Sequence, residues 1–328
     1  MRKIFIHHNG ALGDVLLSLP AIQALKGQGY QIHLAGRQDI VNFLRDFGCI
    51  SAGLRSDDPL FLTLHTEKAD RDVTEYLSCF DRIYVFTREE DSELAANIRL
   101  LFAGARSIRT VPPAGLRRHV SAYRLEQVRP DAKVANYPLL AVPSNYREMA
   151  RAALQSGGYG FKDHLIAIHP GSGSRNKCWP MDRFIELMKS IKTQISCFFV
   201  LFSGPVEDGK LREEIEGCAE DLGKDCLYIS DAGLGTVASL LSLCSLYIGN
   251  DSGVTHLASS VMSSKVISIF GPTDPVLWAP KSDRCVVVAA GDECSPCDGS
   301  LRNSKECGTK CLRDLPAGRV LNLVRFAF

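Results

Sequence analysis

The segment HHNGALGDVLLSLP, residues 7–20, places two glycines beside a carboxylate. Gly10 and Gly13 permit a sharp turn with close backbone approach, and Asp14 then falls in the first turn of an expected helix. The N–H groups at a helix start and the helix dipole favour an ionised carboxylate there. Asp14 is therefore a candidate general base, although an Asp that merely starts a helix fits the same pattern.

The segment HPGSGSRNKCWP, residues 169–180, combines a turn of small residues with two cations. It follows the apolar run LIAI, and its glycines and serines can direct N–H groups and hydroxyls toward an anion. Its Arg and Lys would add charge-assisted contacts to phosphate oxygens, and the next helix should begin at or just after Pro180. The pattern predicts a diphosphate cradle, with a strand–helix loop carrying solvated cations as the alternative. The candidate residues are Gly171, Ser172, Ser174, Arg175 and Lys177.

The segment YIGNDSGVTHLASS, residues 247–260, also feeds a loop of small residues into a helix N-terminus, a geometry that binds anions. Ser252 and Gly253 begin the helix. Asp251 would repel a phosphate, so we expect it to meet sugar hydroxyls. His256, one turn into the helix, fits either a ligand contact or a core position.

Apolar runs of strand length alternate with amphipathic stretches of helix length, and the strand runs lack polar alternation. Such runs are typical of parallel strands covered on both faces by crossover helices. Two such sets predict an α/β protein of two facing Rossmann-like, doubly wound domains with an interdomain cleft, at residues 1–150 and 151–328. The expected strands are 3–8, 31–36, 81–87, 107–111, 164–170, 197–204, 226–230, 245–251 and 265–272.

The charge balance limits the partners. The 328 residues carry 38 Lys and Arg against 37 Asp and Glu, so no global field attracts nucleic acid and any anion recognition must be local. The N-terminus lacks a signal-peptide cleavage site, and no apolar run approaches the ~18 residues that span a bilayer. We expect a soluble, cytoplasmic protein.

Four of the twelve cysteines form CSPCDGSLRNSKECGTKC, residues 294–311. Thiols at this spacing can hold zinc, form disulfides or stay reduced, and zinc is not favoured because the intervening loop is short. We therefore expect no metal and no resident cofactor. The four are Cys294, Cys297, Cys307 and Cys311.

Competing motifs are weak. Asp70-Arg71-Asp72 matches the D-x-D pattern of metal-dependent sugar transferases, but it lies in a polar run rather than after a strand. The chain has no G-x-S-x-G elbow, no phosphate-binding G-x4-G-K-[ST] loop and no G-x-G-x-x-G after its first strand. These absences disfavour serine hydrolases, P-loop enzymes and nicotinamide enzymes.

Taken together, LGDVLLSLPAIQALK, HPGS…K-x-WP, GNDSGVTHLA and FGPTDP resemble the ADP-heptose:lipopolysaccharide heptosyltransferase family, glycosyltransferase family 9. The resemblance covers nearly the whole chain. It implies the GT-B architecture, with an acceptor-binding first domain and a second domain that binds the nucleotide sugar. It also implies metal-independent, inverting transfer of a heptose from ADP-heptose to the inner core of lipopolysaccharide.

The resemblance implies a role for particular residues. Asp14 would be the catalytic base and Lys177 the phosphate-binding lysine, while Glu207 would meet the ribose. The remaining donor contacts would be Ser172, Ser174, Leu234 to Thr236, Asp251, Ser252, Gly253 and His256.

The acceptor would be a glycolipid, which suggests peripheral contact with the cytoplasmic face of the inner membrane. Arg117, Arg118 and His119 could face its anionic core or form a solvated charge run. The extreme C-terminus would pack back on the first domain. The alternatives are a transferase of the same fold with another nucleotide sugar or acceptor, a nucleotide-sugar epimerase or hydrolase, and a non-catalytic nucleotide-binding module. The oligomeric state is not indicated.

Overall fold

The computed structural model describes residues 2–66, 70–88, 93–132, 137–160, 163–291, 295–297, 307–325 and 327. The chain divides into two compact units, Met1–Pro138 and Leu139–Phe328. The sequence placed the boundary at residue 150, which lies inside helix α7 (Ser144–Ser156). That helix belongs to the second unit because it packs on α10 (Leu234–Leu243), where a Cβ on Gly235 would lie 2.5 Å from the Tyr146 ring.

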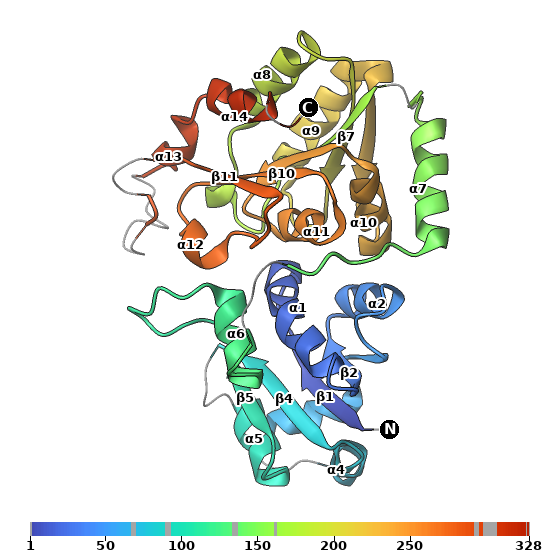
Figure 1. Ribbon diagram of the computed structural model, residues 1–328, viewed down its shortest axis with the longest axis vertical. Helices are drawn as coiled ribbons and strands as arrows, with labels where there is room; N and C mark the ends of the chain where they lie inside the picture. Colours follow the sequence, from blue (N-terminus) through green and yellow to red (C-terminus); the bar gives the residue numbers. More distant parts are fainter. Residues whose placement is uncertain are drawn as a thin grey trace. The chain divides into compact units, whose positions relative to one another are not determined.

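The first unit contains a five-stranded sheet in the order β3-β2-β1-β4-β5 (Figure 1). Every strand pair in it is parallel. The chain reverses direction across the sheet between β1 and β4, so this pair forms the switch point, where ligands of open α/β sheets bind. The strands are β1 (Lys3–His7), β2 (Gln31–Gly36), β3 (Ala52–Arg55), β4 (Arg82–Thr87) and β5 (Arg106–Arg109).

Helices cover the first sheet. Helix α1 is buried almost all round because it packs on α6 as well as on the sheet. A separate buried cluster around Phe5 and Phe61 joins the sheet to α3, α4 and α5. The helical elements are α1 (Leu12–Lys26), α2 (Gln38–Asp46), α3 (Pro59–Leu62), the 3-10 turn Thr63–His65, α4 (Arg71–Ser78), α5 (Glu93–Leu101) and α6 (Val120–Val128).

The second unit contains a six-stranded parallel sheet in the order β11-β10-β9-β6-β7-β8, whose switch point lies between β6 and β9. In the register of that pair His169 lies opposite Gly249, so the loops that follow the two strands start side by side. The strands are β6 (His164–His169), β7 (Cys197–Ser203), β8 (Cys226–Ser230), β9 (Leu246–Asn250), β10 (Lys265–Phe270) and β11 (Cys285–Ala289).

Helices also flank the second sheet. Helix α8 starts at Met181, with Pro180 at its N-cap, as predicted. Trp179, just before it, is fully buried and donates its indole N–H to the backbone oxygen of Leu315 at 3.0 Å. The helical elements are α7, the 3-10 turns Arg175–Lys177 and Gly223–Asp225, α8 (Met181–Lys192), α9 (Gly209–Leu222), α10, α11 (Gly253–Val261), α12 (Pro275–Trp278), α13 (Lys310–Arg313) and α14 (Ala317–Val324).

The predicted fold class is confirmed: two parallel sheets with helical crossovers form two Rossmann-like domains. Strands β3 and β11 were not predicted. Helix α14 packs on α8, and the return of the extreme C-terminus to the first domain stays a prediction. No helix among the described residues combines the length and hydropathy needed to cross a membrane.

Candidate active site

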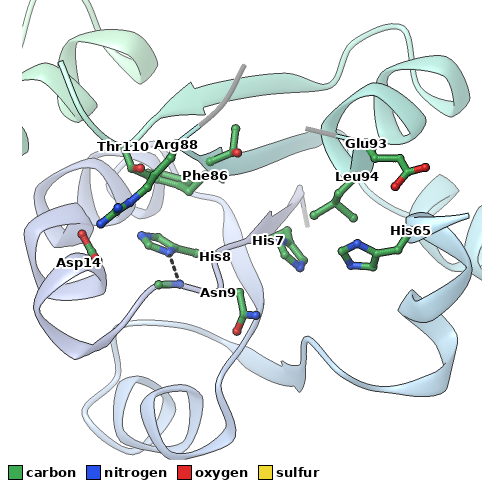
Figure 2. Close-up of a pocket in the computed structure, with 12 residues that line it drawn as sticks. His7, His8, Asn9, Asp14, His65, Phe86, Arg88, Glu93, Leu94 and Thr110 are labelled. Atoms are coloured by element: carbon green, nitrogen blue, oxygen red, sulfur yellow. Dashed lines mark hydrogen bonds between the residues drawn. The ribbon is translucent and has the colours of Figure 1, made fainter. Parts of the chain in front are cut away.

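Asp14 lines a cavity of about 380 Å³ in the first domain. The cavity lies where β1 and β4 end, at the switch point, and Asp14 reaches it from the first turn of α1. Figure 2 shows Asp14 and Arg88 at one end, and His7, His65 and Leu94 toward the other. The lining residues are His7, His8, Asn9, Gly10, Asp14, His65, Phe86, Thr87, Arg88, Glu93, Leu94 and Thr110.

A buried arginine that the sequence analysis did not single out holds Asp14 in place. Arg124 of α6 has no exposed surface, and its Nη2 lies 3.2 Å from Oδ1 of Asp14. Nε and Nη2 donate to the backbone oxygen of Thr110 at 2.9 and 2.7 Å. Nη1 donates to the backbone oxygen of Asp14 and, at 2.9 Å, to Ser18 Oγ. All five N–H groups of the guanidinium are thus used.

His8 extends this network and is held neutral. Burial, together with nearby positive charge, lowers the pKa of His8 well below its usual value. Its Nδ1 accepts the backbone N–H of Gly10 at 3.2 Å, so the ring proton lies on Nε2, 2.9 Å from Ser18 Oγ. The hydroxyl of Ser18 in turn donates to the backbone oxygen of Asp14, and the His8 ring stacks on Phe86 at 4.9 Å. The first turn of α1 is therefore fixed from two sides.

Gly10 is required by this arrangement. A Cβ at Gly10 would lie 2.7 Å from Cε1 of His8 and 2.8 Å from Cβ of Asp14. Both distances are shorter than any real Cβ contact. Gly10 therefore permits the close backbone approach that the sequence predicted for this turn.

In the second domain the two predicted anion-binding loops meet at the switch point. Lys177 Nζ lies 2.8 Å from Oδ2 of Asp251, and the hydroxyl of Thr273 donates to the same oxygen at 2.7 Å. The hydroxyl of Ser172 donates to the backbone oxygen of Asp251 at 2.7 Å. Asn250, fully buried, donates to the backbone oxygen of Pro170 at 2.6 Å. The structure thus joins Lys177, Ser172 and Asp251, with the Ser172 hydroxyl used to tie the loops together.

Ser252 caps helix α11. Its Oγ accepts the backbone N–H of Thr255 at 3.3 Å, which is the usual N-cap bond. The cap leaves the first N–H groups of the helix, starting at Gly253, directed out of its N-terminus. His256 is 4% exposed and sits on the core side of α11. The structure therefore gives this histidine a buried position one turn from the candidate anion site.

Glu207, expected from the family resemblance to meet the ribose, is buried. Its side chain has no exposed surface; Oε2 accepts the backbone N–H of Gly204 at 2.5 Å, and Oε1 lies 3.4 Å from His169 Nε2. Burial would raise the pKa of Glu207, but His169 and the Gly204 N–H outweigh it and hold the pKa below its usual value. A Cβ on Gly171 would lie 1.8 Å from Oε1, so the cradle loop passes directly over this carboxylate.

Other predicted residues lie apart from this cluster or have other partners. Arg175 pairs with Asp208 at 2.8 Å and lines a different cavity, between α8 and α9. Ser174 is exposed beside it. Leu234 and Thr236 are half-buried in the first turn of α10, after β8.

The basic run before α6 makes contacts within its own domain. Arg118 forms an ion pair with Glu126, and His119 caps α6 by accepting the N–H of Ser121 at 3.2 Å. Asp70 caps α4, so the D-x-D match has a structural role. That Asp70-Arg71-Asp72 is not a metal-binding motif remains a prediction from the sequence.

Of the four-cysteine cluster, Cys294 lies outside the described residues, while Cys311 is buried in α13. No group of three or more His, Cys, Asp or Glu within the described ranges is arranged to hold a metal ion. Among the scattered cysteines Cys49, Cys197, Cys218 and Cys244 are buried as expected, and Cys79 is exposed.

Sequence reasoning missed the supporting residues. Arg124 left one signal, since it lies on the helix face that carries Val120, Leu125 and Val128, all buried. A charge on an apolar stripe is rarely buried without a partner. His169, Asn250 and Thr273 lie in the motifs HPGS, GNDSGVTHLA and FGPTDP, but their contacts left no signal in the sequence because their partners come from other loops.

Solved structures share this fold. A glycosyltransferase family 9 protein from Veillonella parvula aligns over 99% of this chain and 97% of its own, with a TM-score of 0.79 and 19% identity. The Escherichia coli ADP-heptose lipopolysaccharide heptosyltransferase II aligns over 100% and 98%, with a TM-score of 0.74 and 16% identity. At these identities the likeness shows the fold alone.

Sequence relatives add the family. Lipopolysaccharide heptosyltransferase 3 of Escherichia coli is 30% identical over 139 residues, 40% of this chain and 38% of its own. Lipooligosaccharide heptosyltransferase 2 of Haemophilus influenzae is 29% identical over 127 residues, 38% and 36%. The chain thus spans less than half the length of these curated relatives. The family model described as glycosyltransferase family 9 (heptosyltransferase) matches residues 121–307, more than half of the chain, and the protein therefore belongs to glycosyltransferase family 9.

Proposed function

We propose that this protein is a glycosyltransferase that transfers a heptose from ADP-heptose to the inner core of lipopolysaccharide, at the cytoplasmic face of the inner membrane, with inversion and without a metal ion. Family membership supports the reaction class. The observation that carries the proposal is Asp14, held by buried Arg124 at the wall of a cavity at the switch point. The names of the matched relatives support the choice of sugar and acceptor.

In this mechanism the first domain supplies the base. A carboxylate oxygen of Asp14 takes the proton of an acceptor hydroxyl while the hydroxyl oxygen attacks the anomeric carbon of the donor sugar. The bond between that carbon and the diphosphate oxygen breaks, and ADP leaves with the bonding electrons. Arg124 Nη2, 3.2 Å from Oδ1, would hold the carboxylate in position to accept that proton.

The second domain would hold the donor. Lys177 and the N–H groups at the start of α11 would stabilise the negative charge that develops on the leaving diphosphate. Asp251, whose charge Lys177 balances in this structure, would accept hydrogen bonds from hydroxyl groups of the donor sugar. Leu234 and Thr236, at the start of α10, would line the adenine side. These positive groups would do what a divalent cation does in metal-dependent transferases.

The test is nucleotide release from a panel of ADP-, UDP- and GDP-sugars, with and without a lipopolysaccharide-core acceptor, in excess EDTA. We expect ADP release from ADP-heptose that requires acceptor and persists in EDTA. Release without acceptor would identify a hydrolase or an epimerase. A preference for another nucleotide sugar would mean that ADP-heptose is not the donor. Activity that EDTA abolishes and magnesium or manganese restores would refute the metal-free mechanism.

A further inference from the structure

The cavity beside Asp14 extends past the carboxylate, and the mechanism above uses only one end of it. Asp14 and Arg88 lie at that end (Figure 2). His7, His65 and Leu94 lie toward the other. The volume of about 380 Å³ falls in the lower part of the range for small-ligand sites. The far end therefore has room for a part of the acceptor beyond its reacting hydroxyl.

His7 is a polar group of the far end with an unpaired nitrogen. It is the last residue of β1, it is only 5% exposed, and it lines the cavity. Its Nδ1 has no hydrogen-bond partner among the described residues. Nearly all buried polar atoms in proteins are paired, and an unpaired one costs stability. We therefore expect an occupant of the cavity to supply the missing partner.

The chemistry of His7 suits a hydroxyl better than an anion. Burial, with the charge of His65 adding, lowers the pKa of His7 from 6.5 to about 4, so the ring is uncharged at pH 7.5. A neutral imidazole offers one N–H donor and one acceptor nitrogen, and a hydroxyl is likewise both donor and acceptor. A carboxylate or phosphate would gain no charge attraction from this ring. His8 is held neutral by burial as well.

The charged side chains around the cavity balance one another. Asp14 is paired with Arg124, whose Nη2 lies 3.2 Å from Oδ1. The other charged groups among the described lining residues are one carboxylate, Glu93, and one guanidinium, Arg88, both exposed. Besides the two buried histidines, the exposed His65 is the remaining titratable group. Clefts that attract anions carry an excess of positive charge, and two guanidinium groups against two carboxylates give no such excess.

Apolar surface completes the lining. Phe86 and Leu94 are both buried and both line the cavity, and the Phe86 ring stacks on His8 at 4.9 Å. A sugar ring carries C–H groups on its faces and hydroxyls around its edge. It therefore fits a site with an apolar wall and a few placed polar groups.

We propose that this cavity binds the acceptor through an uncharged sugar ring, which presents one hydroxyl to Asp14 for the attack and pairs another with His7, and that His7 selects such a sugar over an acidic one. This inference rests on the proposed function, because it names the class of acceptor for the same site. It also gives the transfer a place in a reaction sequence. The reaction that supplies its acceptor must be one that adds an uncharged sugar to the core.

The experiment compares two truncated lipopolysaccharide-core oligosaccharides as acceptors, with ADP-heptose as donor at pH 7.5. One ends in an uncharged heptose and the other in a sugar that bears a carboxylate. We expect kcat/KM to be roughly tenfold higher, or more, for the uncharged terminus. Equal transfer to both, or a preference for the acidic terminus, would overturn the inference while leaving heptose transfer intact. No transfer to either would overturn the proposed function, and this inference with it.

His7→Phe tests the residue to which the selection is assigned. Phenylalanine keeps a ring at this position but has no nitrogen to pair with a hydroxyl. We expect the KM for the uncharged acceptor to rise roughly tenfold, with kcat and ADP affinity unchanged. A wild-type KM in this variant would contradict the assignment.

His33→Phe is the matched control. His33 lies on the neighbouring strand β2, its ring packs edge-on against Phe80 at 5.1 Å, and it is not among the residues that line the cavity. This variant should keep the wild-type KM for the acceptor.

A measurement on the wild type keeps the inference testable if His7→Phe fails to fold. The imidazole nitrogen shifts of His7 should change when the oligosaccharide with the uncharged terminus is added, and should not change with ADP. Shifts that do not respond to the oligosaccharide would refute the contact. Amide exchange of β1 reports on the fold of the variant, and it should be no faster than in the wild type because phenylalanine leaves no unpaired polar atom there.

Discussion

The guanidinium of Arg124 contacts both the carboxylate and the backbone oxygen of Asp14, so one buried cation fixes the side chain and the helix turn that carries it. Burial lowers the pKa of Arg124, and the charge of Asp14 opposes that shift. An arginine keeps its proton under such a shift because its ordinary pKa is so high. The carboxylate therefore has a permanent positive partner behind it and an open cavity in front.

Asp14→Asn should abolish transfer while leaving ADP affinity unchanged. The amide cannot accept the acceptor proton, which should lower kcat by roughly 10²–10⁴-fold, whereas ADP would be held by the second domain. The measurement is steady-state transfer together with calorimetry of ADP.

Asp39→Asn is the matched control for that variant. Asp39 also lies in the first turn of a helix, α2, but it is exposed and paired with Arg37. It should retain full turnover. Near-normal turnover by Asp14→Asn would remove Asp14 from the role of base.

Gly10→Ala should lower kcat without weakening ADP binding. The added Cβ would lie 2.8 Å from Cβ of Asp14, so the carboxylate must move away from the position that Arg124 sets. Misplacing a catalytic group by about 1 Å can cost roughly 100-fold in rate.

Gly104→Ala is the control for this steric test, because no described residue beyond its two chain neighbours has a heavy atom within 4 Å of its Cβ position. It should leave kcat unchanged. If Gly10→Ala turned over at the wild-type rate, the close packing of this loop would have no bearing on catalysis.

The structure separates what the sequence could predict from what it could not. The central strands were predicted because both faces of each are covered, which requires continuous apolar runs. Strand β3, AGLR, is a short edge strand of mostly half-buried residues and carries little pattern, whereas edge strand β11, CVVVA, has a continuous apolar run and was nevertheless not predicted. The domain boundary depends on which unit α7 packs against, and no local signal records that.

The candidate site divides in the same way. Glycine-bearing loops after strands were predictable because strand order and loop composition are local properties. The contact between Asp14 and Arg124 joins residues 110 positions apart, and the tie between Ser172 and Asp251 joins residues 79 apart. Such pairs arise from the order of strands in the sheet. One sequence without an alignment contains no information on them beyond a charge on an apolar helix face.

Lys177→Gln should weaken ADP binding and lower kcat together. Removing the ammonium takes one charge-assisted contact from the diphosphate, and it also leaves the buried carboxylate of Asp251 without its 2.8 Å partner. We expect ADP affinity to fall by roughly 10–100-fold.

Arg175→Gln tests the other cation of the same loop. Arg175 is exposed and paired with Asp208, and exposed ion pairs contribute little. We expect less than a threefold change in ADP affinity. Equal losses in the two variants would place Arg175 at the diphosphate as well.

The stability of the first domain should fall below neutral pH because of His7. Burial, with the charge of His65 adding, lowers the pKa of His7 from 6.5 to about 4, and its Nδ1 has no hydrogen-bond partner among the described residues. Between those two pH values the unfolded chain binds the proton and the folded chain does not. The contribution of this residue is therefore fully present above pH 6.5 and is lost as pH falls toward 4.

Replacing His7 with glutamine removes this titration. The free energy of opening strand β1 is compared between wild type and His7→Gln at each pH. The difference between the two proteins should change by about 2 kcal/mol between pH 7.5 and pH 5.0. Amide hydrogen exchange of β1 is the suitable measurement, because both tryptophans, Trp179 and Trp278, lie in the second domain and their fluorescence would report on it alone. Comparing the two proteins at each pH cancels the intrinsic exchange rate. An equal pH dependence in both would mean that His7 titrates alike in the folded and unfolded chains, contrary to the burial of its ring.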